Sequence, residues 1–140
     1  MRGVLDTSVL AAGLRSRLGA SNRLLMLVAE GRCVPLVTTA MFLEYEDVLL
    51  RPEQRLATGM STDDVAGFLA AFASASEPVE VHFVWRPQLS DPADEMILEA
   101  AVNGRADCIL THNQRDFESV ARTFGIPVMT AARAIKELTK

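Results

Sequence analysis

Short apolar runs alternate with stretches of helical spacing along the chain, and this pattern indicates an α/β protein. The apolar runs are rich in Val, Ile and Leu, and none reaches the roughly 18 residues that a membrane span requires. Pro35 lies within the second run and favours a strand that lacks one fully paired neighbour. The five predicted strands are residues 4–6, 33–37, 79–85, 108–110 and 127–129.

Between the predicted strands, apolar residues recur every three to four positions, as they do in amphipathic helices. The predicted helices begin near residue 7 and then cover residues 21–31, 38–50, 61–76, 91–104, 117–124 and 130–138. Residues 53–60 are polar and are expected to be irregular. The alternation predicts a parallel sheet of about five strands sandwiched between α-helices, in one domain over residues 1–140.

Composition narrows the class of protein. With 49% hydrophobic and 23% charged residues, the chain has the balance of a globular protein. The net charge of −4 lacks the basic footprint of a typical nucleic-acid binder, but acids gathered around cations would not repel phosphate. The two cysteines, Cys33 and Cys108, lie in apolar runs and are expected to be free and buried. Because the first predicted strand leaves no room for a signal peptide, we expect a cytoplasmic protein.

The stretch from Asp91 to Phe117 organises the candidate chemistry. Asp91 suits a helix N-cap, and Pro92 suits the first helical position, where its missing N–H is not needed. Asp94 follows one turn into that helix and should lie close to Asp91. After the predicted strand at 108–110, the chain continues Thr-His-Asn-Gln-Arg-Asp. Open α/β sheets bind ligands at the carboxyl ends of their strands, so we expect the functional site in this loop.

Several acidic residues fall where a parallel sheet would bring them to one edge. Asp6 ends the first predicted strand, Asp94 starts the helix before the fourth, and Asp116 follows the fourth. The third predicted helix adds another candidate, either Glu44 or Glu46. These two flank opposite edges of its apolar stripe, and only one edge can face a shared cleft.

Such a carboxylate cluster indicates a bound cation, because neighbouring acids repel and raise one another's pKa. Mg²⁺ and Mn²⁺ prefer oxygen ligands, and they activate water for attack at phosphorus. The pattern therefore indicates a metal-dependent hydrolase. Helix capping accounts for the same acids without a metal, and spacing alone leaves both interpretations open. In the helix that contains Asp94, the apolar stripe places Glu95 and Glu99 toward solvent.

Four motifs resemble those of PIN-domain ribonucleases and follow that family's order over essentially the whole chain. They are Val-Leu-Asp-Thr-Ser-Val-Leu at 4–10, Phe-Leu-Glu-Tyr-Glu-Asp-Val-Leu-Leu-Arg-Pro at 42–52, Asp-Pro-Ala-Asp-Glu-Met-Ile-Leu-Glu-Ala-Ala at 91–101 and Ala-Asp-Cys-Ile-Leu-Thr-His-Asn-Gln-Arg-Asp-Phe at 106–117. The resemblance is closest to the VapC-like toxins of bacterial toxin–antitoxin pairs. It implies a single PIN domain over residues 1–140 and a metal-dependent endoribonuclease.

The resemblance also implies which acids act. Asp6, Glu44, Asp94 and Asp116 match the family's catalytic acids, which hold Mg²⁺ or Mn²⁺, and the match selects Glu44 over Glu46. The implied partners are an RNA substrate, a small antitoxin protein and a second copy of the chain in a homodimer. No membrane partner is expected.

Three residues are expected to support the acids. Ser8 matches the small polar residue beside the first aspartate, and Asp91 is a cap or a neighbour of the metal ligands. Many family members have an acid where this chain has Asn113, so Asn113 competes for the fourth metal position. His112 could contact RNA, but a hydrogen-bonded loop histidine is the favoured interpretation. If Asn113 fills the fourth position, the alternative is a catalytically quiet PIN-like module that binds RNA or protein.

Overall fold

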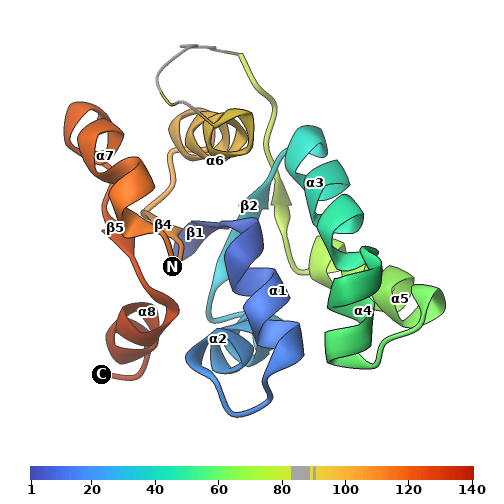
Figure 1. Ribbon diagram of the computed structural model, residues 1–140. Helices are drawn as coiled ribbons and strands as arrows, with labels where there is room; N and C mark the ends of the chain where they lie inside the picture. Colours follow the sequence, from blue (N-terminus) through green and yellow to red (C-terminus); the bar gives the residue numbers. More distant parts are fainter. Residues whose placement is uncertain (83–88, 90) are drawn as a thin grey trace.

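A five-stranded, all-parallel sheet forms the middle of the molecule (Figure 1). The computed structural model describes residues 1–82, 89 and 91–140. The strands lie in the order β3-β2-β1-β4-β5, which places β1 at the centre. They are β1 (Arg2–Leu5), β2 (Val34–Val37), β3 (Glu77–Pro78), β4 (Cys108–Leu110) and β5 (Val128–Met129). The predicted α/β fold, with about five parallel strands between helices, is confirmed.

Helices cover both faces of the sheet, with α1, α2 and α8 on one side and α6 and α7 on the other (Figure 1). From β1 the chain winds toward β3, and it then crosses back to β4 and winds toward β5. Right-handed crossovers in opposite directions place their helices on opposite faces. The helices are α1 (Thr7–Arg15), α2 (Ala20–Ala29), α3 (Thr39–Leu49), α4 (Pro52–Thr58), α5 (Thr62–Ser74), α6 (Pro92–Asn103), α7 (Glu118–Phe124), α8 (Ala131–Leu138) and the short 3₁₀ helix η1 (Gln114–Phe117). In the described ranges, no helix is both long and apolar enough to cross a membrane.

The two winding directions diverge between the neighbouring strands β1 and β4. Such a switch point leaves a crevice at the carboxyl ends of the two strands, because the chains that follow them turn to opposite sides. Asp6 directly follows β1, and the loop Thr-His-Asn-Gln-Arg-Asp directly follows β4. The topology therefore places the predicted site in this crevice.

The expectation that residues 53–60 are irregular is wrong. Most of this segment belongs to α4, which has Pro52 at its start and ends at Gly59 in the left-handed conformation, with φ of 74°. Proline at the first helical position and glycine after the last are the usual ends of a helix. The helix α4 buries only Gln54, so its sequence lacks the apolar spacing by which the other helices were predicted.

The third predicted strand, residues 79–85, is only partly comparable with the structure. The strand in this region is β3, which comprises Glu77–Pro78, and residues 79–82 follow it outside any strand. Val79 continues the pairing by one hydrogen bond, with its N–H donating to Val37 O at 2.9 Å. Residues 83–85 lie outside the described residues.

Pro35 lies in β2, between β1 and β3, and the expectation that one neighbour of this strand is not fully paired is confirmed on the β3 side. The pairing with β3 involves only Leu36 and Val37. Val34 N donates to Met1 O, on the β1 side, at 2.8 Å. Because successive residues of a strand point their backbone nitrogens to opposite sides, the nitrogen of Pro35 faces β3. Pro35 therefore lacks its N–H at a point where β3 has not yet begun.

Tyr45 fixes α3 against the end of β1. Its side chain is fully buried, its hydroxyl donates to Leu5 O, and its ring packs edge-on against Phe72 of α5 with ring centroids 5.7 Å apart. This contact holds the middle of α3, which carries Glu44, beside the last residue of β1.

Cys33 and Cys108 are buried and free, as predicted. Burial raises the pKa of the Cys33 thiol to about 11 and that of Cys108 to about 12. Both cysteines therefore remain thiols at neutral pH and act as small apolar residues of the core.

Candidate active site

Asp6 is the most firmly held acid of the site. It follows β1, its N–H donates to Leu110 O at 2.9 Å, and its side chain is only 8% exposed. Its Oδ2 accepts hydrogen bonds from Ser8 Oγ at 3.0 Å and from Thr111 Oγ1 at 2.6 Å. Oδ1 accepts no hydrogen bond from the described residues. The carboxylate is thus oriented through Oδ2.

Thr111 is a site residue that the sequence analysis missed. It is fully buried, it directly follows β4, and its Oγ1 also accepts from Asn113 N at 3.0 Å. The same hydroxyl therefore holds Asp6 on one strand and shapes the loop after the neighbouring strand. The available signal was its position, since a hydroxyl residue directly after β4 must lie beside the end of β1.

Asp94 lies near the other acids of the site, and their charges act on its carboxyl group. It lies half-buried in the first turn of α6, whose N-cap Asp91 accepts from Ala93 N at 2.9 Å. Burial, followed by the charges of Asp91, Asp6 and Asp116 in that order, raises the pKa of Asp94 from its usual 3.8 to about 6. Asp6, Asp91, Asp94 and Asp116 are called the carboxylate cluster below.

Asp116 reaches the carboxylate cluster from η1. The residue is exposed, and its N–H donates to Asn113 O at 3.1 Å. Helix capping does not account for it, because the N-cap of α7 is Phe117 and Asp116 lies within η1. Asn113 is exposed and precedes η1 without capping it through its side chain. Both candidates for the fourth position therefore remain beside the crevice.

Glu44 lies half-buried on α3, whereas Glu46 on the same helix is exposed. The α3 helix packs against both α1 and α6, which follow Asp6 and contain Asp94 respectively. Glu44 is not among the charges that raise the pKa of Asp94. Of the four predicted acids, Asp6 and Asp116 thus lie near enough for their charges to act on Asp94, and Glu44 lies on an adjoining helix.

The prediction that Glu95 and Glu99 face solvent is wrong, because their side chains are 4% and 7% exposed. The backbone N–H of Leu89 donates to Glu95 Oε1. The buried surface of α6 is therefore wider than its apolar stripe. Both glutamates have hydrogen-bond or electrostatic partners.

The chemistry of the carboxylate cluster fits a hard divalent cation. All of its side chains offer oxygen ligands, and their mutual repulsion is one cause of the raised pKa of Asp94. A cation would relieve that repulsion. Within the described ranges, no group of three or more Asp, Glu, His or Cys side chains is arranged so that it could hold a metal ion. Mg²⁺ commonly needs only one or two carboxylates, with water and phosphate oxygens as its other ligands.

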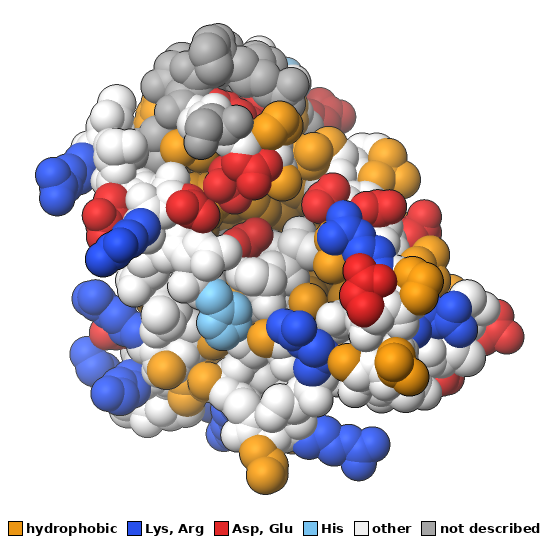
Figure 2. All heavy atoms as spheres, viewed as in Figure 1, with side chains coloured by type: hydrophobic (Ala, Val, Ile, Leu, Met, Phe, Trp, Pro, Cys, Tyr) orange, Lys and Arg blue, Asp and Glu red, His pale blue; other side chains and the backbone are white. Residues whose placement is uncertain are grey.

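Figure 2 shows that Asp and Glu side chains gather around a recess on one face of the molecule. Lys and Arg side chains lie to either side of this acidic area. On this face, acidic side chains are thus flanked by basic ones.

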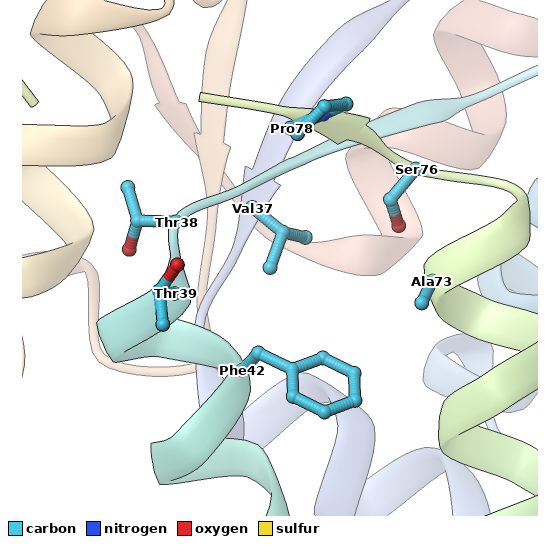
Figure 3. Close-up of a pocket in the computed structure, with 7 residues that line it drawn as sticks. All are labelled: Val37, Thr38, Thr39, Phe42, Ala73, Ser76 and Pro78. Atoms are coloured by element: carbon cyan, nitrogen blue, oxygen red, sulfur yellow. The ribbon is translucent and has the colours of Figure 1, made fainter. Parts of the chain in front are cut away.

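A separate hollow lies beyond β2, between α3 and α5 (Figure 3). Its floor is Val37, and the ring of Phe42 and the Ser76 side chain border it. Its lining is Val37, Thr38, Thr39, Phe42, Ala73, Ser76 and Pro78. None of these side chains carries a charge, so this hollow supplies no carboxylate ligand and is distinct from the carboxylate cluster.

Comparison with protein families gives one match. The PIN domain family model covers residues 2–115, which is more than half of the chain and includes Asp6, Glu44 and Asp94. The match ends one residue before Asp116. No curated protein and no solved structure matches the chain significantly. The chain belongs to the PIN domain family, whose members are generally nucleases that use divalent metals.

Proposed function

We propose that this chain is an Mg²⁺- or Mn²⁺-dependent endoribonuclease in which residues 1–140 form one PIN domain. The observation that carries the proposal is the raised pKa of Asp94, which reports burial together with the charges of Asp91, Asp6 and Asp116. Strongly perturbed carboxylates in a crevice are typical of catalytic and metal sites. The family match supports the same conclusion.

In this proposal Asp6, Glu44, Asp94 and Asp116 hold the cation, and Asn113 orients water or a phosphate oxygen. The cation would supply activation of water and stabilisation of the charge that develops on the phosphate. Ser8 and Thr111 hold Asp6 through Oδ2, which keeps Oδ1 directed to the ligand position. Asp91 fixes the start of α6 and thereby the position of Asp94.

We further propose that the protein is the VapC-like toxin of a cytoplasmic toxin–antitoxin pair, and that it forms a homodimer. Exposed apolar side chains support a protein partner, since Leu43 on α3 is 58% exposed and Leu56 on α4 is 87% exposed. The small antitoxin would restrain the nuclease until the toxin is released.

Cleavage of a mixed RNA panel by the purified chain, with Mg²⁺, Mn²⁺ or chelator, tests the proposal. We expect cleavage that requires metal and is lost in Asp94→Asn and Glu44→Gln. Glu46→Gln is the matched control, because Glu46 is an exposed acid on the same helix, and it should cleave like the wild type. Equal cleavage by wild type and Asp94→Asn would contradict the proposal. RNA binding without cleavage would instead support the catalytically quiet module.

A further inference from the structure

His112 has an exposed side chain whose orientation is nevertheless fixed. It follows Thr111 in the loop after β4, at the edge of the carboxylate cluster. Its ring nitrogen Nε2 lies 3.0 Å from Ser21 Oγ, and its backbone N–H donates to Ser8 Oγ at 3.5 Å. An exposed histidine normally samples several rotamers, whereas here the contact with Ser21 orients the ring and the contact with Ser8 holds the backbone.

The Ser21 hydroxyl is held in place by the packing of α2 on α1. Ser21 is only 4% exposed. A Cβ atom on Gly13 would lie 2.6 Å from Leu25 Cδ1 and 3.2 Å from the Ser21 carbonyl, so the two helices approach closely at this glycine. Asn22 Nδ2 also donates to Gly13 O at 2.9 Å. The partner of the histidine ring is therefore part of the rigid core of the fold.

Ser8 connects His112 with the carboxylate cluster. Its hydroxyl donates to Asp6 Oδ2 at 3.0 Å and accepts from the backbone of His112. One side chain thus separates the histidine backbone from an acid that we assign to the metal. A group bound at Asp6 would therefore lie close to residue 112.

The hydrogen bond to Ser21 leaves one ring nitrogen available. Among the described residues, no group forms a hydrogen bond with His112 Nδ1. When Ser21 donates its proton to Nε2, the neutral ring carries its own proton on Nδ1 and is a donor there. Non-bridging phosphate oxygens are strong acceptors, and RNA presents one at every nucleotide.

We propose that His112, held by Ser21 and Ser8, is a positioning residue that donates through Nδ1 to a phosphate oxygen of the RNA backbone beside the carboxylate cluster. This inference rests on the proposed ribonuclease function. The contact forms equally in the bound substrate and in the transition state, so its loss should raise KM and leave kcat nearly unchanged.

Two substitutions of His112 test the roles of its two ring nitrogens separately. In His112→Asn the side-chain amide occupies the place of Nδ1 and keeps the donor toward RNA. In His112→Gln the amide occupies the place of Nε2, which keeps the contact with Ser21 but removes that donor. On an RNA that the wild type cleaves, we expect Gln and Ala variants to raise KM about tenfold, and Asn to remain within about threefold of the wild type.

Thermal unfolding of each variant and binding of the same labelled RNA in EDTA accompany the kinetics, with His82→Ala as the control. His82 is an exposed histidine after β3 that should leave KM unchanged. Asn and Gln variants with equal losses, or a loss confined to kcat, would overturn the positioning role. Wild-type values in every variant would overturn it while the nuclease stands. A wild type that cleaves no RNA would overturn both proposals.

Discussion

Replacing Asp94 by asparagine should stabilise the metal-free protein at neutral pH. The native structure raises the pKa of Asp94 from its usual 3.8 to about 6, through burial first and the charges of Asp91, Asp6 and Asp116 second. The folded protein therefore binds this proton more tightly than the unfolded chain. The free energy of unfolding falls as pH rises from about 4 through about 6, because ionised Asp94 is less favourable in the folded state.

The size of the effect follows from the difference between the two pKa values. A difference of about two corresponds to nearly 3 kcal/mol as an upper limit. Since the Asp94 side chain is half-buried, solvent screening reduces the expected gain in unfolding free energy to about 1 kcal/mol. Asparagine has nearly the same shape and no charge, so packing should change little. For a chain of this length, about 1 kcal/mol corresponds to roughly 3 °C in Tm.

Urea unfolding of wild type and Asp94→Asn in EDTA, at several pH values between 4 and 8, measures this difference. The variant should be more stable by about 1 kcal/mol at pH 8, and the difference should shrink toward pH 4, where wild-type Asp94 is protonated. Glu46→Gln, an exposed acid on α3, should change stability by less than about 0.5 kcal/mol at every pH.

When Mg²⁺ or Mn²⁺ is added, the wild type should become more stable than Asp94→Asn. A ligand that binds only the folded state stabilises it, so the wild type should gain stability and Asp94→Asn should gain less. Equal stability of the two metal-free proteins at pH 8, or a less stable variant, would refute the electrostatic argument. A difference that does not change with pH would show that the substitution acts through packing.

Three further substitutions test contacts within and around the site. Thr111→Val removes the donor to Asp6 and should lower metal-dependent cleavage at least tenfold while the fold persists, which circular dichroism would verify; undiminished cleavage would contradict this role. Tyr45→Phe leaves Leu5 O without its buried donor and should lower the unfolding free energy by about 1–2 kcal/mol in urea titrations, whereas no change would show that water replaces the hydroxyl. Ser61→Ala removes one half of the capping box of α5 and should cost about 1 kcal/mol in the same assay, with cleavage unaffected; a loss of cleavage would connect α5 to the site.

The sheet and most helices could be predicted because local signals agree with the final packing. The run Cys108–Leu110 is fully buried, and such strands are uniformly apolar. The helix predicted over residues 61–76 begins with a capping box of Ser61 and Asp64, in which Asp64 takes the place of the usual Glu or Gln. These features depend on residues that are close in sequence, so they can be recognised without the structure.

The errors arise where distant segments decide the outcome. Glu95 and Glu99 are buried, and the N–H of Leu89, which lies outside the helix, donates to Glu95; helical periodicity carries no information about such contacts. Thr111 acquires its role only because β4 lies beside β1, which brings its hydroxyl to Asp6. The acids themselves were predictable, since the ends of parallel strands share one edge of the sheet.

The most direct test of the central claim is Mn²⁺ binding to the purified chain without RNA, measured by calorimetry on wild type, Asp94→Asn and Glu46→Gln. We predict that wild type and Glu46→Gln bind Mn²⁺ equally, and that Asp94→Asn binds it at least tenfold more weakly because one ligand of the carboxylate cluster is lost. Equal binding by all three proteins would contradict the assignment of this cluster as the metal site.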